Sequence, residues 1–144
     1  MYRAALALCG RREDAEDLVQ DTFARILTKP RMLNDDEVGG YLMQAMRNTF
    51  ITNRRDASRR PVSAPMDFDP EETRPIGRPD DVATAMDLYA AISRLSDEHR
   101  DVIVAIDVVG LSYAEAAAVV DAPEGTVMSR LYRARRALAG MLTD

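Results

Sequence analysis

One stretch near the end of the chain, residues 111–136, constrains the fold more than any other. Ser112 and Glu115 have the spacing of a capping box, in which each side chain hydrogen-bonds the other residue's backbone N–H at the start of a helix. The helical pattern breaks at Asp121, and Pro123 predicts the start of a second helix, because proline is favoured in a first helical turn. Apolar residues then recur at helical spacing and predict a buried stripe: Val127, Leu131, Ala134 and Leu138.

The two predicted helices differ in character. The first is short and rich in alanine, whereas the second is longer and has a polar, basic outer face that consists of Ser129, Arg130, Tyr132, Arg133 and Arg136. A short helix, a tight turn and a longer helix with a basic face are typical of a helix-turn-helix that binds DNA. An ordinary helical hairpin with a solvated basic face is the alternative that this pattern leaves open.

Composition extends the helical prediction to the whole chain. Alanine, leucine, methionine and arginine are abundant, and because these residues favour helices we expect an all-α protein. Cys9 is the only cysteine and His99 the only histidine, which excludes an internal disulfide and leaves no zinc-ligand pattern or nucleophile–base pair. No apolar run approaches the roughly 20 residues that span a bilayer. We therefore expect a cytoplasmic protein that is not an enzyme, with no cofactor, no metal and no membrane contact of its own.

The net charge of −5 argues against DNA binding until its distribution is considered. Residues 61–101 carry 4 basic and 10 acidic side chains, whereas residues 1–60 carry 11 basic and 9 acidic ones. Residues 61–80 are rich in proline and acid and poor in apolar residues, which is typical of a flexible linker. The sequence thus predicts two small helical domains, residues 1–60 and residues 81–144, joined by that Pro-rich acidic linker.

In the first domain we expect helices over residues 2–9, 13–27 and 41–57, with a loop over residues 29–40. Apolar residues of the second helix form a one-sided stripe: Ala15, Leu18, Val19, Phe23, Ile26 and Leu27. The opposite face is acidic and suits either solvent or a basic partner surface. A metal or acid–base site is disfavoured there, because no histidine or converging polar group accompanies the carboxylates.

The third helix of this domain has an inner side composed of Leu42, Ala45, Met46, Thr49, Phe50 and Asn53. Arg47 and Asn48 fall largely outside that side, where they suit phosphate and base-edge contacts. A snorkelling arginine and a solvated asparagine fit the same pattern. In the second domain, an apolar stripe over residues 82–95, a cap at Ser96 and Gly110 predict two more helices before the helix-turn-helix.

Three stretches of the sequence resemble the extracytoplasmic-function family of sigma factors. The family's polymerase-binding helix is similar to GRREDAEDLVQDTFARIL, and its promoter-binding C-terminal domain is similar to LSDEHRDVIVAIDVVGLSYAEAAAVVDAPEGTVMSRLYRARRAL. The intervening helix of the family's first domain is similar to YLMQAMRNTFITNRRDASRR. This order of motifs covers nearly the whole chain except the linker. A generic helix-turn-helix regulator would explain only the last of the three.

The resemblance implies a sigma factor that binds RNA polymerase core enzyme, through the β′ clamp helices and the β subunit, and directs promoter recognition and transcription initiation. It implies polymerase contacts at Asp17, Gln20 and Asp21. It implies contacts to the −10 promoter strand from the loop over residues 34–40 and from Arg47, Asn48, Arg54 and Arg55. Contacts to the −35 element are implied at Thr126, Met128, Ser129, Arg130, Tyr132, Arg133 and Arg136.

Two features depart from the family pattern. Met128 stands where the family often has lysine or arginine, so an apolar contact to a thymine methyl replaces a charge-assisted one. Family members usually begin well upstream of the first helix, whereas this chain begins inside it; either the first domain lacks part of its core or the true start lies upstream.

Family members are commonly held inactive by an anti-sigma factor between the two domains, so such a partner is implied as well. Two alternatives to a working sigma factor remain open. One is a sigma-like interaction module that binds an anti-sigma factor without acting at promoters, and the other is a stand-alone helix-turn-helix DNA-binding regulator.

Overall fold

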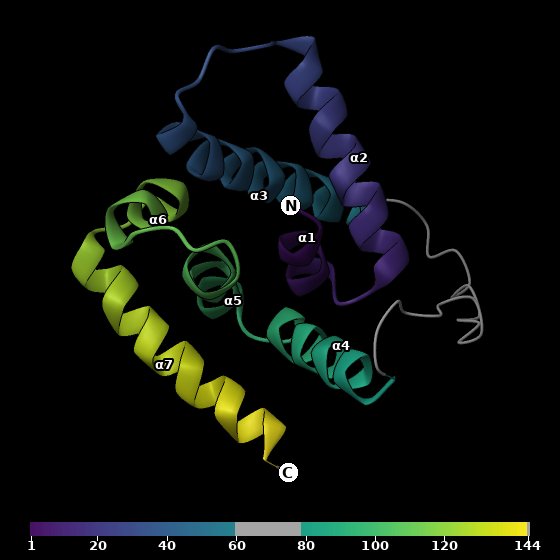
Figure 1. Ribbon diagram of the computed structural model, residues 1–144, viewed down its shortest axis with the longest axis vertical. Helices are drawn as coiled ribbons and strands as arrows, with labels where there is room; N and C mark the ends of the chain where they lie inside the picture. Colours follow the sequence, from purple (N-terminus) through teal and green to yellow (C-terminus); the bar gives the residue numbers. More distant parts are fainter. Residues whose placement is uncertain (60–78, 144) are drawn as a thin grey trace.

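The computed structural model describes residues 1–59 and 79–143, which contain helices and no strand (Figure 1). The first half contains α1 (Tyr2–Cys9), α2 (Arg12–Thr28) and α3 (Asp35–Arg59). The second half contains α4 (Pro79–Ser93), α5 (Asp97–Ile103), a π-helical continuation of α5 (Val104–Val108), α6 (Tyr113–Val120) and α7 (Glu124–Leu142). The all-α prediction is confirmed. The predicted linker lies outside the described residues, except that α4 already begins at Pro79.

The short helix α1 lies at the centre of the packing. Its residues 4–8 are buried, and their alanines allow α2 and α4 to approach closely. Gly10 ends the helix in the left-handed region with φ 75°, as expected for a C-terminal glycine, and its N–H donates to the Leu6 carbonyl at 2.7 Å. A Cβ at Gly10 would lie only 2.3 Å from Ser93 Oγ, so the glycine also allows the end of α4 to pass α1.

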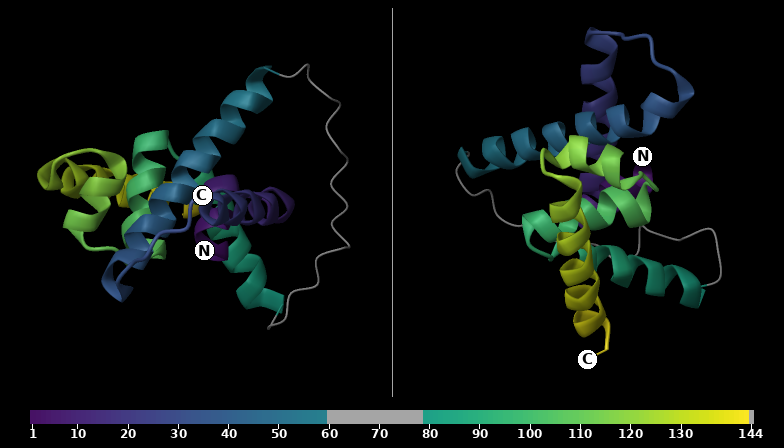
Figure 2. Two further views of the ribbon diagram at one scale, coloured as in Figure 1. Left: turned by 90° about the horizontal axis from the view of Figure 1, so that it is seen from above. Right: turned by 90° about the vertical axis from the view of Figure 1, so that its left-hand side faces the viewer.

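The two halves share one apolar core. From the first half, α1 packs against α4 and α5, and α3 packs against α6, an arrangement visible from three directions in Figures 1 and 2. The buried cluster joins Leu18 and Met46 from the first half to Ile103 and Leu131 from the second. A Cβ at Gly39 would meet Leu111 Cδ2 at 3.3 Å, so a glycine in α3 permits this close approach. The two predicted domains are therefore packed against each other in this structure.

The start of α3 differs from the prediction. The helix begins at Asp35 rather than near Tyr41, so most of the predicted loop over residues 34–40 is helical. The Asn34 backbone N–H donates to Glu37 Oε2 at 3.3 Å, and three acidic residues in the first turn favour a helix N-terminus. Gly39 and Gly40 lie inside the helix, and each lowers helix stability by about 1 kcal/mol relative to alanine. The contacts at the N-terminus and the packing of α3 on α6 offset this cost.

The apolar stripe of α2 is buried only along its first part. Ala15 and Leu18 are buried, but Phe23 is 45% exposed and Leu27 is 73% exposed, so only the first part of the predicted one-sided stripe belongs to the core. Figure 1 shows the reason, since the C-terminal end of α2 diverges from α3 and has no helix over it. Thr22 is buried instead, and its hydroxyl donates to the Leu18 carbonyl at 2.6 Å.

Candidate nucleic-acid interface

The predicted helix-turn-helix is present and is formed by α6 and α7. Ser112 and Glu115 make both hydrogen bonds of the capping box, each at 3.1 Å. The turn between the helices contains Asp121, which has φ 53°, and Pro123, which is the N-cap of α7. The stripe of α7 is buried at Val127, Leu131 and Ala134, while Leu138 is half-buried.

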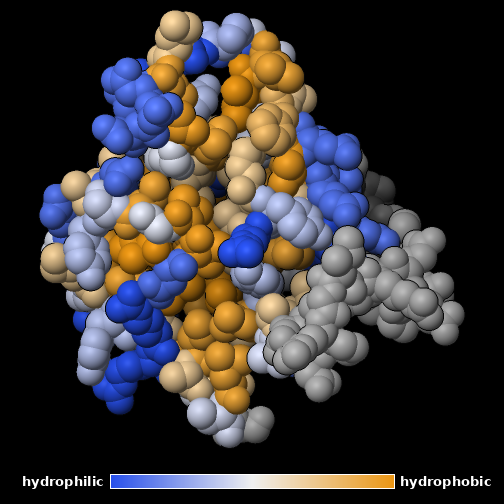
Figure 3. All heavy atoms as spheres, viewed as in Figure 1, coloured by the Kyte–Doolittle hydropathy of each residue, from blue (hydrophilic) through white to orange (hydrophobic). Residues whose placement is uncertain are grey.

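The opposite side of α7 faces solvent. Figure 3 shows hydrophilic side chains along the outer side of this helix and apolar surface across the middle of the same view. Five of the seven predicted −35 residues are exposed: Met128, Ser129, Tyr132, Arg133 and Arg136. The Arg136 guanidinium lies 5.8 Å from the centre of the Tyr132 ring, which is a cation–π contact between two exposed side chains. Thr126 is half-buried at the start of the helix.

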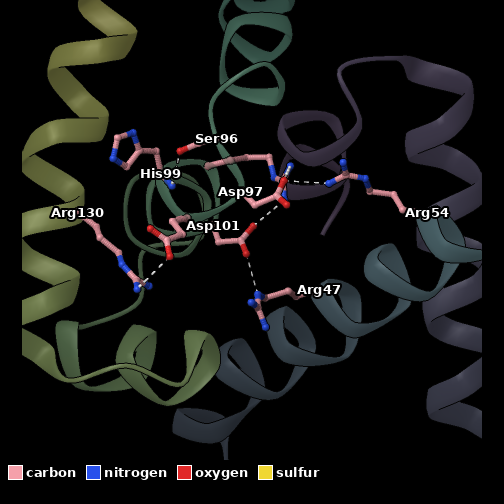
Figure 4. Close-up of polar contacts among 9 residues, drawn as sticks. Arg47, Arg54, Ser96, Asp97, His99, Asp101 and Arg130 are labelled. Carbon is pink, nitrogen blue, oxygen red and sulfur yellow. Dashed lines mark hydrogen bonds and ion pairs between the residues drawn. The ribbon is translucent and has the colours of Figure 1, made fainter. Parts of the chain in front are cut away.

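Arg130 differs from the other arginines of this face. Its side chain is half-buried, and its Nη2 donates to Glu98 Oε1 of α5 at 3.4 Å (Figure 4). The bond is long and Glu98 is largely exposed, so it orients Arg130 without holding it firmly.

Two of the four predicted −10 residues face the second half of the chain. Arg47 Nε donates to Asp101 Oδ2 at 2.8 Å, and Arg54 Nη1 donates to Asp97 Oδ1 at 2.9 Å, as Figure 4 shows. The expectation that Arg47 lies largely outside is therefore wrong, because α5 covers it. Asn48 and Arg55 are exposed on α3, and Arg54 remains exposed despite its ion pair, with 55% of its side chain accessible.

Arg100, on α5, occupies the centre of this group of charges. Only 4% of the residue is exposed, and its guanidinium donates to Asp97 at 2.9 Å and to Asp101 at 3.1 Å. It also lies 4.8 Å from the centre of the Phe50 ring of α3. The hydrogen bond from Arg54, more than any other contact, lowers the pKa of Asp97 below its ordinary value.

Sequence reasoning identified neither Asp97, Arg100 nor Asp101 as members of a site. The only signal was the charge-rich start of the helix that Ser96 caps, and a solvated helix end has the same signal. The Ser96 cap itself is present, with its Oγ accepting from the His99 N–H at 3.4 Å.

The acidic face of α2 is exposed at Asp17, Gln20 and Asp21. Asp21 Oδ2 accepts a hydrogen bond from Asn53 Nδ2 of α3 at 3.1 Å. A cleft of about 630 Å³ adjoins this face, and its lining includes carboxylates from α2, the apolar side chains of Leu18 and Phe50, and the guanidinium groups of Arg54 and Arg100. The cleft therefore combines charges of both signs with apolar surface.

The described residues were expected to lack metal-ligand clusters and reactive thiols, and two observations bear on these features. Within residues 1–59 and 79–143, no group of three histidine, cysteine or acidic side chains could hold a metal ion. Burial, followed by the Asp14 charge, raises the pKa of the free Cys9 thiol to about 12, which disfavours a nucleophilic role. None of the described helices has the length and apolarity needed to cross a membrane.

Comparison with known proteins relates both halves of the chain to one family. The profile described as sigma-70 region 2 matches residues 1–60, and the profile described as sigma-70, region 4 matches residues 85–138. The ECF RNA polymerase sigma factor SigL of Mycobacterium tuberculosis is 37% identical over 96% of this chain and 80% of its own length. SigE of Mycolicibacterium smegmatis, another ECF sigma factor, is 35% identical over 99% of this chain, which spans 57% of that protein.

Two solved structures have a similar arrangement of helices. The sigma factor RpoE from Bartonella quintana, in complex with the anti-sigma factor NepR, matches with a TM-score of 0.69 and 27% identity over 98% of this chain and 89% of RpoE. CnrH, in complex with the cytosolic domain of CnrY, matches with a TM-score of 0.66 and 26% identity over 98% of this chain and 79% of CnrH.

Proposed function

This chain belongs to the extracytoplasmic-function family of RNA polymerase sigma factors, and from that premise we propose that it binds the core enzyme and directs promoter recognition and transcription initiation. The observation that carries the proposal is the presence, in one chain, of a helix-turn-helix with an exposed basic face and a separate acidic face on α2. A repressor that acts alone needs only the first of these surfaces. The proposed role is binding rather than catalysis, in the cytoplasm.

The acidic face of α2 is proposed to contact the polymerase. Of the residues on this face, Asp17 and Asp21 are negative and would repel the DNA backbone, whereas Gln20 is neutral, so electrostatic complementarity favours a basic protein surface. We assign this contact to the clamp helices of the β′ subunit, and we assign a contact of the second half to the β subunit. The exposure of all three side chains supports the first assignment.

The promoter contacts are proposed to be divided between the two halves. Residues 1–60 carry the −10 contacts at Arg47, Asn48, Arg54 and Arg55, residues 81–144 carry the −35 contacts on α7, and residues 61–80 link the two. Exposure of Asn48 and Arg55 supports the first group, and the outward face of α7 supports the second. Met128 is 48% exposed on that face, which suits an apolar contact with a thymine methyl.

An anti-sigma factor is proposed as a further partner. RpoE, whose fold matches over 98% of this chain, was solved with the anti-sigma factor NepR. The alternative of a sigma-like interaction module keeps this partner and loses the promoter function. One observation favours it, namely that Arg47 and Arg54 both have carboxylate partners within the protein.

Transcription from a promoter library with purified core enzyme tests the proposal. We expect specific run-off transcripts when the full chain and core enzyme are both present, and weak binding of promoter duplex by the chain alone. The net charge of −5 leaves each half with only a small basic face, and non-specific DNA affinity depends mainly on such charges. Tight duplex binding without core enzyme would favour the stand-alone regulator, and core binding without any transcript would favour the interaction module.

A further inference from the structure

Two ion pairs cross between the halves of the molecule. Arg47 of α3 pairs with Asp101 at 2.8 Å, and Arg54 of α3 pairs with Asp97 at 2.9 Å. Among the ion pairs of the side chains described in residues 1–58 and 84–143, these two connect the first half with the second, and the others lie within the second half. Both arginines belong to the group proposed for the −10 strand.

The carboxylates that hold these arginines are themselves held in place. Arg100 lies between them and donates to both Asp97 and Asp101, so cations and anions alternate from Arg54 to Arg47 (Figure 4). Arg100 and Arg54 also lie over the Phe50 ring of α3, at 4.8 Å and 5.4 Å from its centre. Because the partners are already fixed, less conformational entropy is lost when each ion pair forms. The ion pairs of this network therefore stabilise the contact between α3 and α5 more than isolated surface ion pairs would.

We propose that Asp97 and Asp101, which we name the α5 latch, hold the two halves together by occupying Arg47 and Arg54 in place of promoter phosphates. A guanidinium binds carboxylate and phosphate through the same N–H donors. Arg47 Nε cannot donate to Asp101 and to a DNA phosphate with full strength at once. The latch therefore closes the molecule when DNA is absent, and single-stranded DNA competes with it. This inference rests on the proposed −10 role of α3.

The latch acts as a bias on closure rather than as its sole cause. The apolar core that α1 and α3 share with the second half also favours the packed arrangement. Removal of both carboxylates should thus shift the balance between open and closed forms without separating the halves completely. We expect a shift of about fivefold to thirtyfold toward the open form, which corresponds to about 1–2 kcal/mol.

The first test measures closure in the free, full-length chain. Spin labels are attached at Lys29→Cys and Ala139→Cys, both exposed sites, in a Cys9→Ala background. Pulsed electron paramagnetic resonance then measures the distance between the two halves. Asp97→Asn with Asp101→Asn should broaden the distance distribution toward longer values. Asp97 is largely exposed, so Asp97→Asn alone provides a smaller shift of the same sign if the double variant does not fold.

A matched control removes the same charge elsewhere. Asp107 bonds Arg135 at 2.6 Å within the second half, and Asp87 is exposed on α4, so Asp87→Asn with Asp107→Asn changes the net charge equally without touching α3. This control should leave the distance distribution as in the parent. An unchanged distribution in both Asp97 variants, or equal broadening in the control, would overturn the latch.

The second test measures DNA affinity with a fluorescent oligothymidine as the probe. Loss of the latch should tighten binding of this single strand about fivefold or more, and the matched control should tighten it much less. The two assays separate the latch from the proposed function. If the latch variants open but neither they nor the parent initiate transcription with core enzyme, the latch stands and the sigma function fails. If they remain closed while the parent transcribes, the sigma function stands and the latch fails.

Discussion

Gly10 offers a direct test of how the two halves pack. Its φ of 75° lies in the left-handed region, and a Cβ there would fall 2.3 Å from Ser93 Oγ of α4. Alanine in the left-handed region costs about 1–2 kcal/mol. Overfilling a packed site costs about 1–3 kcal/mol more, because Ser93 and the end of α4 must move. We therefore expect Gly10→Ala to lower the free energy of unfolding by about 2–5 kcal/mol.

Gly110 is a matched control for the backbone contribution. Its φ is 87°, but a Cβ there would have nothing within 4 Å. Gly110→Ala should consequently lose only the conformational part, about 1–2 kcal/mol. Ser93→Gly removes the atoms that the new methyl group would strike. The double variant Gly10→Ala/Ser93→Gly should thus recover the packing part of the loss, which appears as a coupling energy between the two sites.

Urea unfolding followed by far-ultraviolet circular dichroism measures the free energy of unfolding of the parent, the three single variants and the double variant. In a chain of this size, thermal midpoints should fall by about 2–4 °C for each kcal/mol lost, which provides an independent check. Equal losses for Gly10→Ala and Gly110→Ala, with no coupling to Ser93, would refute the close packing of α1 on α4.

Three further predictions concern single surfaces. Asp17→Lys with Asp21→Lys should weaken core-enzyme binding in a pull-down and leave the unfolding midpoint nearly unchanged, since exposed charges contribute little to stability. Asp87→Lys is the control, and equal binding of core enzyme by the parent, the double variant and the control would contradict the assignment. Arg133→Ala should weaken binding of the −35 element by about 1–3 kcal/mol in the polymerase complex, and transcription equal to the parent's would exclude it as a reader. Cys9 has its pKa raised from 9.0 to about 12, so at pH 8 iodoacetamide should alkylate the folded thiol at least about tenfold more slowly than the urea-unfolded one, and the rate should rise with pH over the range in which the protein stays folded. Similar alkylation rates in the two states would show that the thiol is not buried.

Local features of the fold were predictable because their causes are local. The capping box at Ser112, the C-terminal glycine at Gly10 and the start of α7 after Pro123 each depend on residues within one turn of the helix end. The buried stripe of α7 follows from the 3.6-residue period of a helix. Such features are decided by backbone geometry, so they appear in the sequence directly.

Other features depended on neighbours that the sequence does not identify. Helical periodicity predicts which residues share a face, but not how far a second helix extends over that face, and so the exposure of Phe23 and Leu27 does not follow from the sequence. The start of α3 was missed because Gly39 resembles a loop residue until Leu111 is known to pack against it. In both cases a residue distant in sequence decides the outcome.

By itself, the sequence determined the helical class, the helix-turn-helix and the family, since capping, periodicity and motif order are properties of neighbouring residues. Only the tertiary structure decided which charges meet. Arg47 and Asp101 are 54 residues apart and Arg54 and Asp97 are 43 apart, so no local rule pairs them. An arginine on a helix face suits a phosphate or a carboxylate equally, because both accept from the same N–H groups. The placement of α5 beside α3 is what gives both arginines carboxylate partners within the protein.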